Sequence, residues 1–172
     1  MKSTIIILSL LFVCACDYSV QSANINGNPA LTASQYINYS ESTHRQELSH
    51  YIGVDPVRTE WCAAFVNAVL GESGMVNLFD LNSKTPLMAR GFLDWGTPVT
   101  VAGPGDLLIF PRGNQGWQGH VGFWMGTIIQ DNVAYYQVLG GNQNNKVSIK
   151  LYRVSTVISI RRNSWYTFYH SE

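Results

Sequence analysis

Cys62 and His120 are the side chains in this sequence whose types and settings could carry out covalent chemistry. The other two cysteines, Cys14 and Cys16, lie in an apolar N-terminal segment, so the rest of the chain holds a single thiol. Exported proteins with several cysteines usually use them in disulfides. A lone thiol at the start of a helix, with a histidine on a later strand, is instead typical of a nucleophile and its base.

Cys62 falls in the first part of a predicted helix over residues 59–72, with Thr59 as N-cap and Gly74 in the left-handed conformation beyond its end. In the first turn the sulfur would face unpaired backbone N–H groups and the positive end of the helix dipole. Both favour the thiolate and predict a lowered pKa for the thiol. A small buried core residue is the alternative, and position alone leaves the two interpretations open.

His120 follows a glycine-rich loop over residues 112–119 and begins a predicted strand. A histidine at the mouth of a strand is placed to face a groove. Its neighbours on that face, Gly122 and Gly126, lack side chains and leave space for another group or for a substrate.

A third residue follows from the predicted hairpin between residues 120–129 and 133–142. With a tight turn at residues 130–132, the numbers of two residues that face each other across the hairpin sum to about 262. His120 therefore faces Asn142, and a shift of one residue in the strand register would make Gln143 its partner instead. Opposed side chains in an antiparallel pair share a face and lie roughly 5 Å apart. An amide at this place would orient the imidazole toward Cys62. Ordinary turn chemistry is the alternative for Asn142, because it lies in a glycine- and asparagine-rich run.

The elements that position these residues are helices first and strands afterwards. Short helices are predicted within residues 34–52, followed by helices over 59–72 and 86–95. Strands are predicted over 106–110, 120–129, 133–139, 146–154 and 157–161. This order predicts an α+β domain in which helices pack on an antiparallel meander.

The N-terminus predicts export. Residues 1–16 have a positive head, an apolar run and a small-residue exit, which describe a secretory signal. The run is too short to span a bilayer, which needs about 20 apolar residues. Residues 13–16 also resemble a bacterial lipobox, which would place a lipid on Cys16 and anchor the protein to the membrane. Simple cleavage after Ala15 or near residues 22–23 stays open.

We therefore expect a linker over residues 17–33, a catalytic domain over 34–166 and a tail over 167–172. The domain is long enough for a single core. The chain has 11 basic and 11 acidic residues, so its formal net charge is zero, and no basic stripe suggests nucleic-acid binding. The cysteine and histidine spacings contain no CxxC or HxxxH pattern, so neither a metal nor a cofactor is expected.

Four runs carry a resemblance to a known family: WCAAFVN (61–67), GD (105–106), GHVGF (119–123) and VLGGNQ (138–143). In this order and spacing they resemble bacterial and phage CHAP domains (cysteine- and histidine-dependent amidohydrolase/peptidase) and NlpC-type cell-wall peptidases, over residues 48–162. The resemblance implies a papain-like fold and a cysteine hydrolase, and the predicted signal segment places the protein in the periplasm or cell envelope. Its substrate would be the peptidoglycan stem peptide, cut as an endopeptidase or as an N-acetylmuramoyl-L-alanine amidase.

The implied catalytic set is Cys62, His120 and Asn142, and Trp61, Arg112 and Trp117 are candidates to line the substrate groove. Many CHAP domains carry an acid two residues before the asparagine, where this chain has glycine. This departure keeps a second hypothesis open, a non-catalytic wall-binding domain on the same scaffold. Families of this kind also include secreted toxins, for which a cognate inhibitor or immunity protein would be a partner.

Overall fold

The structure is a computed structural model, and it describes residues 28–164. The predicted signal segment, the lipidation candidate Cys16 and the predicted tail therefore lie outside the described residues. The predicted linker ends earlier than expected, because α1 already spans Pro29–Ser34. Ala30 and Ala33 of this helix are buried in the core, so the domain includes α1.

Helices precede most of the strands, as predicted. The helical elements are α1 (Pro29–Ser34), α2 (Arg45–Ile52), α3 (Cys62–Glu72) and the 3-10 helices η1 (Ala89–Asp94) and η2 (Val154–Thr156). The strands are β1 (Thr97–Val99), β2 (Leu107–Pro111), β3 (Gly119–Gln130), β4 (Val133–Gly140), β5 (Ser148–Arg153) and β6 (Ser159–Arg162). The α+β class is therefore confirmed.

Within the described part of the chain, the six strands form one antiparallel sheet in the order β1-β6-β2-β3-β4-β5. Strands β2 to β5 form the predicted meander. Strand β6 then returns to the other side of β2, where it also pairs with the short strand β1. Strands β2 and β3 are therefore interior, and β3 carries His120 into the middle of the sheet.

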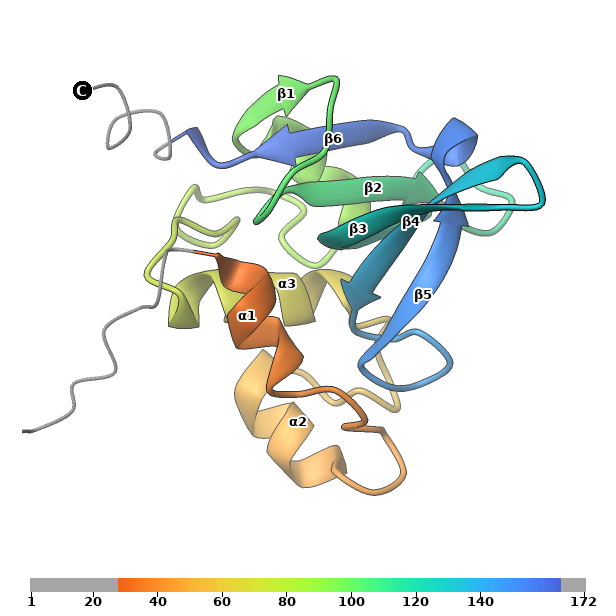
Figure 1. The fold of residues 1–172 in the computed structure, drawn as a ribbon. Coiled ribbons are helices and arrows are strands. Elements are labelled where there is room, and N and C mark those ends of the chain that lie inside the picture. Colours follow the sequence, from red (N-terminus) through yellow and green to blue (C-terminus); the bar gives the residue numbers. More distant parts are fainter. Residues whose placement is uncertain (1–27, 165–172) are drawn as a thin grey trace, which may run out of the picture.

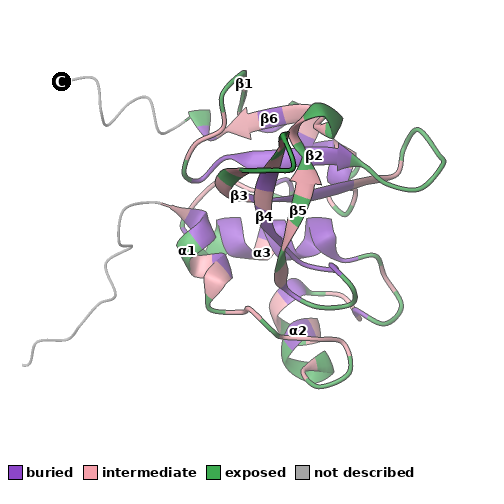
Figure 2. Cartoon of the chain, turned by 45° about the vertical axis from the view of Figure 1, so that its right-hand side comes forward, coloured by how far each residue is buried: buried purple, intermediate pink, exposed green. Residues whose placement is uncertain are grey.

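Helices α1, α2 and α3 lie on one side of the sheet (Figure 1). Helix α3 is almost entirely buried (Figure 2), because its sequence is apolar on nearly every side and it packs between the sheet and the other helices. A second, smaller core lies on the opposite face of the sheet and includes Leu108, Phe110 and Val138. The sheet is thus covered by hydrophobic side chains on both faces along β2 and β3.

The predicted helix over residues 86–95 is wrong, because a turn and then η1 occupy this segment. The side-chain amide of Asn67 in α3 donates to the Pro86 carbonyl at 2.7 Å and holds the start of the segment. A Cβ on Gly91 would lie 2.5 Å from the Thr85 carbonyl oxygen, so the chain doubles back tightly here. Bonds from Met88 N–H to Thr85 and from Gly91 N–H to Met88 have the i to i−3 spacing of a 3-10 helix.

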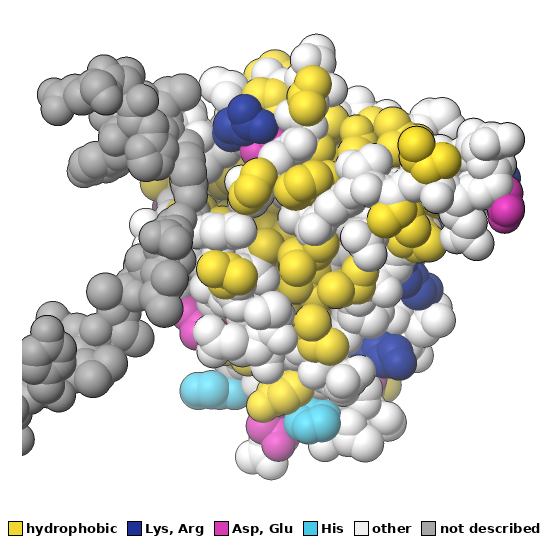
Figure 3. Space-filling model, in the orientation of Figure 1, with side chains coloured by type: hydrophobic (Ala, Val, Ile, Leu, Met, Phe, Trp, Pro, Cys, Tyr) yellow, Lys and Arg dark blue, Asp and Glu magenta, His cyan; other side chains and the backbone are white. Residues whose placement is uncertain are grey.

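The face seen in Figure 1 carries a band of hydrophobic side chains, and its basic side chains are scattered (Figure 3). Ile149 and Leu151 of edge strand β5 are among the exposed large hydrophobic residues. In residues 28–164, no helix is long and apolar enough to cross a membrane.

Candidate functional site

Cys62 is the first residue of α3. The helix begins later than predicted, because Trp61 rather than Thr59 is its N-cap, a shift of two residues, and no side chain caps it. The first backbone N–H groups of the helix therefore have no partner inside the helix. At the other end Gly74 has a φ of +70°, which confirms the predicted left-handed stop.

The thiol of Cys62 lies against backbone donors, yet its pKa is raised. Burial is the largest cause, and it outweighs the nearby Arg112 guanidinium and the N–H groups of Val121 and Ala63, which act in the opposite direction. The prediction that the thiol pKa is lowered is therefore wrong. The backbone donors at the helix start do lower it, as predicted, but burial raises it by more. The resting form of Cys62 is the neutral thiol.

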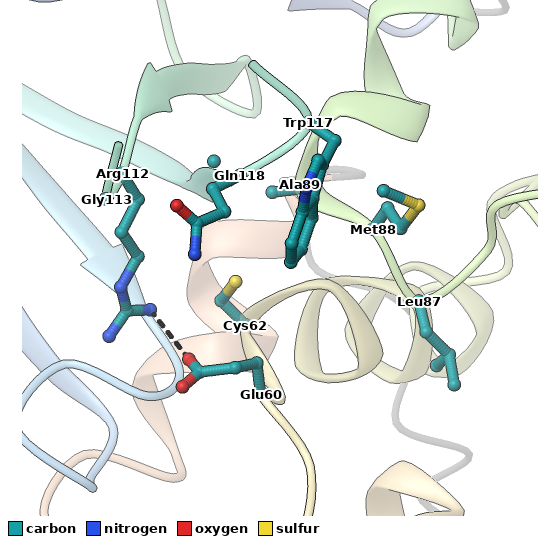
Figure 4. Close-up of a pocket in the computed structure, with 10 residues that line it drawn as sticks. Glu60, Cys62, Leu87, Met88, Ala89, Arg112, Gly113, Trp117 and Gln118 are labelled. Atoms are coloured by element: carbon teal, nitrogen blue, oxygen red, sulfur yellow. Dashed lines mark ion pairs between the residues drawn. The ribbon is translucent and has the colours of Figure 1, made fainter. Parts of the chain in front are cut away.

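A pocket of about 330 Å³ opens over Cys62. Its floor and walls come from three segments: the start of α3, the turn before η1 and the loop between β2 and β3. Figure 4 shows the sulfur directed into this space, between Gln118 and Trp117. The lining residues are Glu60, Cys62, Leu87, Met88, Ala89, Arg112, Gly113, Trp117, Gln118 and Gly119. Although only 4% of Cys62 is exposed, the thiol borders open space.

Two of the lining residues, Glu60 and Arg112, form a polar triangle with Asn142. The Arg112 guanidinium lies 3.3 Å from the Glu60 carboxylate (Figure 4). The Asn142 side chain donates to the same carboxylate at 2.6 Å, and Arg112 donates to the backbone carbonyl of Asn142 at 3.3 Å. The Asn142 amide therefore binds Glu60 and not the imidazole of His120.

His120 is buried in β3 opposite Phe110 of β2. Its ring stacks on Tyr152 of β5, with centroids 5.4 Å apart and planes inclined by 12°. Gly140 lies close to the Nε2 and Cε1 atoms of the ring, since a Cβ there would lie 3.2 Å from Nε2. Neither ring nitrogen has a hydrogen-bond partner among the described residues. The imidazole is thus held by packing.

Burial lowers the pKa of His120 to about 3, with Arg112 acting in the same direction and Gln143 opposing it. The imidazole is therefore neutral at physiological pH. A neutral imidazole can accept a proton, which is the state that a general base requires.

The predicted hairpin register is confirmed close to the site, but the predicted partner is not. Phe123 pairs with Leu139, so facing numbers sum to 262 there, and a bulge after Trp124 shifts the outer part of the hairpin. The β3–β4 ladder ends at the pair Phe123–Leu139 and strand β4 ends at Gly140, so Asn142 lies beyond both with a φ of +54°. Asn142 therefore does not become the cross-strand neighbour of His120.

Gln143, the alternative amide, raises the pKa of His120 and also binds the ring that packs against it. Its side-chain oxygen accepts from the Tyr152 hydroxyl at 3.0 Å, and its side-chain nitrogen donates to backbone carbonyls that include those of Val138 and Gly140. Because Tyr152 stacks on His120, Gln143 fixes the ring against which the imidazole packs.

The structure links the thiol to the strand of the imidazole through the backbone. The His120 ring lies with Phe110 and Tyr152 on the face of the smaller core, whereas Cys62 and Val121 belong to the larger core on the helix side. The N–H of Val121, the residue after His120, lies at the sulfur of Cys62. Because both imidazole nitrogens lack partners in the described part of the chain, no hydrogen bond joins the thiol to the imidazole in this structure. Catalytic hydrogen bonds are often long in the unliganded state and tighten when substrate binds.

Two of the three predicted groove residues, Arg112 and Trp117, line the pocket. Trp61 does not: its indole is fully buried and donates to Glu41 at 2.8 Å. The N-cap position directs this side chain into the core, where it packs against Phe65.

The pocket is also lined by Glu60, Gln118 and residues 87–89, which the sequence did not predict as site residues. Glu60 precedes the thiol by two residues and Gln118 precedes the imidazole by two, so proximity in sequence was an available signal. Segment 87–89 reaches the pocket only through the fold. In residues 28–164, no cluster of three His, Cys, Asp or Glu side chains could hold a metal ion.

No family model, no curated protein and no solved structure matches the chain. The geometry of the pocket is therefore the basis for assigning a function.

Proposed function

We propose that this protein is an exported cysteine hydrolase that cleaves amide bonds in peptidoglycan stem peptides. The observation that carries the proposal is the placement of the Cys62 thiol on the floor of a pocket, at a helix start and beside the strand that carries a buried, unpartnered imidazole. The substrate class rests on the resemblance of the sequence motifs to CHAP and NlpC-type hydrolases.

The proposed reaction is acyl transfer through a thioester. His120 accepts the thiol proton as the sulfur attacks the amide carbonyl carbon, and the carbonyl π electrons move to oxygen to form an oxyanion. The C–N bond then breaks, and the proton on His120 passes to the leaving amine. Water attacks the thioester with His120 again as base, which releases a carboxylic acid and restores the thiol.

The pocket walls suit a peptide with an acidic group. Leu87, Met88 and the 60% exposed Trp117 offer apolar contact area on one side. On the other side Arg112 presents a guanidinium that already binds a carboxylate, that of Glu60. A carboxylate of the stem peptide would compete with Glu60 for Arg112, since the Glu60 side chain is 79% exposed.

Two observations favour a second function, a non-catalytic wall-binding domain. The thiol pKa is raised and the thiol–imidazole hydrogen bond is absent among the described residues, and both features suit an inert cysteine. The two functions differ in the fate of bound peptidoglycan, because only the hydrolase releases fragments.

The deciding experiment incubates purified peptidoglycan with the wild type and with Cys62→Ala, and identifies soluble fragments by mass spectrometry. We expect release by the wild type and loss of release in Cys62→Ala, with similar urea unfolding of the two proteins. Gln115→Ala, an exposed substitution on the pocket loop, is the control and should retain release. Equal release by wild type and Cys62→Ala would exclude the hydrolase, and retention of the protein on intact peptidoglycan without release would support the binding domain.

A further inference from the structure

Gln118 is the polar side chain on the pocket wall that faces the thiol. It belongs to the loop between β2 and β3, and Figure 4 shows its amide nitrogen directed toward the sulfur of Cys62. The reaction proposed above leaves this residue without a role.

The orientation of the Gln118 amide is fixed by chemistry. Its oxygen accepts from the backbone N–H of Asn114 at 2.9 Å and from that of Gln115 at 3.0 Å. Two N–H donors require an oxygen at this position, since an amide NH₂ group cannot accept from them. The amide nitrogen must therefore be the atom that points into the pocket.

The surrounding loop is built around this side chain. A Cβ on Gly113 would lie 2.1 Å from the Gln118 amide oxygen and would displace the amide, and Gly113 has a φ of +64°, which glycine adopts without strain. The Gln118 backbone is held as well, because its carbonyl accepts from Arg90 at 2.8 Å and its N–H donates to the Gln115 carbonyl at 3.0 Å. The donor over the thiol is thus positioned before any ligand binds.

The donor is also unused. In the described part of the chain, the Gln118 amide nitrogen makes no hydrogen bond, whereas its oxygen makes two. A rigid N–H donor in a partly desolvated pocket is what a developing oxyanion requires.

We infer that the Gln118 side-chain amide donates to the oxyanion of the tetrahedral intermediate, opposite the backbone N–H of Cys62. This inference rests on the proposed acyl-transfer function. When the sulfur bonds to the carbonyl carbon, the π electron pair moves to oxygen, and the Gln118 N–H stabilises that charge until the C–N bond breaks.

Gln118→Glu separates this role from a structural one. Glutamate has nearly the shape of glutamine, and one carboxylate oxygen can still accept from the Asn114 and Gln115 N–H groups. The other oxygen then presents a negative acceptor to the oxyanion in place of a donor. A residue that only holds the loop would tolerate this change, whereas an oxyanion donor would not.

The test compares two reactions of the Cys62 thiol. Acylation by p-nitrophenyl acetate passes through a tetrahedral oxyanion and releases nitrophenolate, whereas alkylation by iodoacetamide forms no oxyanion. The acylation rate is divided by the alkylation rate at the same pH, which corrects for any change in thiolate content. Cys62→Ala supplies the background for reaction at other groups.

We expect this ratio to fall about 10²- to 10³-fold in both Gln118→Ala and Gln118→Glu, and to stay at the wild-type value in Gln115→Ala. An unchanged ratio in Gln118→Glu would overturn the inference, even if Gln118→Ala fails to fold. A wild-type thiol that forms no acyl-enzyme would overturn it too. A Gln118-dependent ratio in a protein that releases no peptidoglycan fragments would leave the oxyanion donor standing and exclude the wall substrate.

Discussion

Substitution of His120 by glutamine should remove a large part of the acid sensitivity of this fold. The buried imidazole has a pKa of about 3, whereas the unfolded chain would have a value near 6.5. Because the folded pKa is depressed, the contribution to stability is complete above pH 6.5. It is lost as the pH falls toward 3, since the unfolded chain then binds a proton that the native protein excludes.

The magnitude follows from the two pKa values. Each pH unit between them removes about 1.4 kcal/mol from the free energy of unfolding. At pH 4.5, two units below the unfolded pKa and above the folded one, the wild type should have lost about 2.7 kcal/mol through this residue alone. Glutamine does not titrate, so His120→Gln should lack this component while keeping the titrations of all other groups.

Urea unfolding at pH 7.0 and pH 4.5 measures the difference directly. The loss of unfolding free energy between the two pH values should be about 2.7 kcal/mol smaller in His120→Gln than in the wild type. His50→Gln, on the exposed side of α2, is the control for removal of a histidine and should keep the wild-type loss. Equal losses in wild type and His120→Gln would refute the buried, neutral imidazole.

Two other perturbations test the packing and the charges around the thiol. Gly141→Ala should lower the free energy of unfolding by about 1–3 kcal/mol, because the new Cβ would lie 2.6 Å from the buried indole of Trp61. The control Gly116→Ala adds a Cβ that meets nothing within 4 Å and should cost under about 0.5 kcal/mol. Equal urea midpoints for the two variants would contradict this prediction. Arg112→Gln should raise the pKa of Cys62 and Glu60→Gln should lower it, because the guanidinium stabilises the thiolate and the carboxylate opposes it. The pH profile of iodoacetamide alkylation should therefore shift in opposite directions in the two variants. Shifts in the same direction would contradict these effects of the two charges.

Local patterns in the sequence predicted the elements best. The run of apolar residues after Cys62 requires a buried helix, and Gly74 ends it because glycine adopts a positive φ without strain. The hairpin itself was also predictable, since Asp131 and Asn132 form a two-residue turn with positive φ at both positions. This turn is one residue shorter than the predicted turn at 130–132, and the predicted register appears near the site only because the bulge after Trp124 shifts the pairing by one.

The errors arose where distant parts of the chain decide the outcome. The expected helix over residues 86–95 does not form because Asn67, a residue of another element, binds the carbonyl at its start. Asn142 does not face His120 because strand β4 ends at Gly140. The next residue, Gly141, packs against the start of α3, since a Cβ there would meet Trp61. Neither contact is visible in sequence periodicity.

The thiol pKa shows the same division between local and distant causes. The helix start and its N–H donors, which the sequence reveals, lower the pKa, but burial by the surrounding fold raises it further than they lower it. Cys62 and His120 therefore rest as a neutral pair, because burial disfavours the thiolate and the imidazolium alike.

A neutral resting pair has a consequence for the proposed mechanism. Charge must appear on sulfur, imidazole and carbonyl oxygen during attack, in a site where the protein offers few compensating groups. Of the charged side chains at the pocket, Arg112 lowers the thiol pKa but also the imidazole pKa, so it favours the thiolate while opposing the imidazolium. Proton transfer to His120 is therefore most favourable when negative charge has already moved to the carbonyl oxygen, where fixed N–H donors stabilise it. In this site, activation of the nucleophile and stabilisation of the oxyanion are coupled, and substrate binding is what makes the pair reactive.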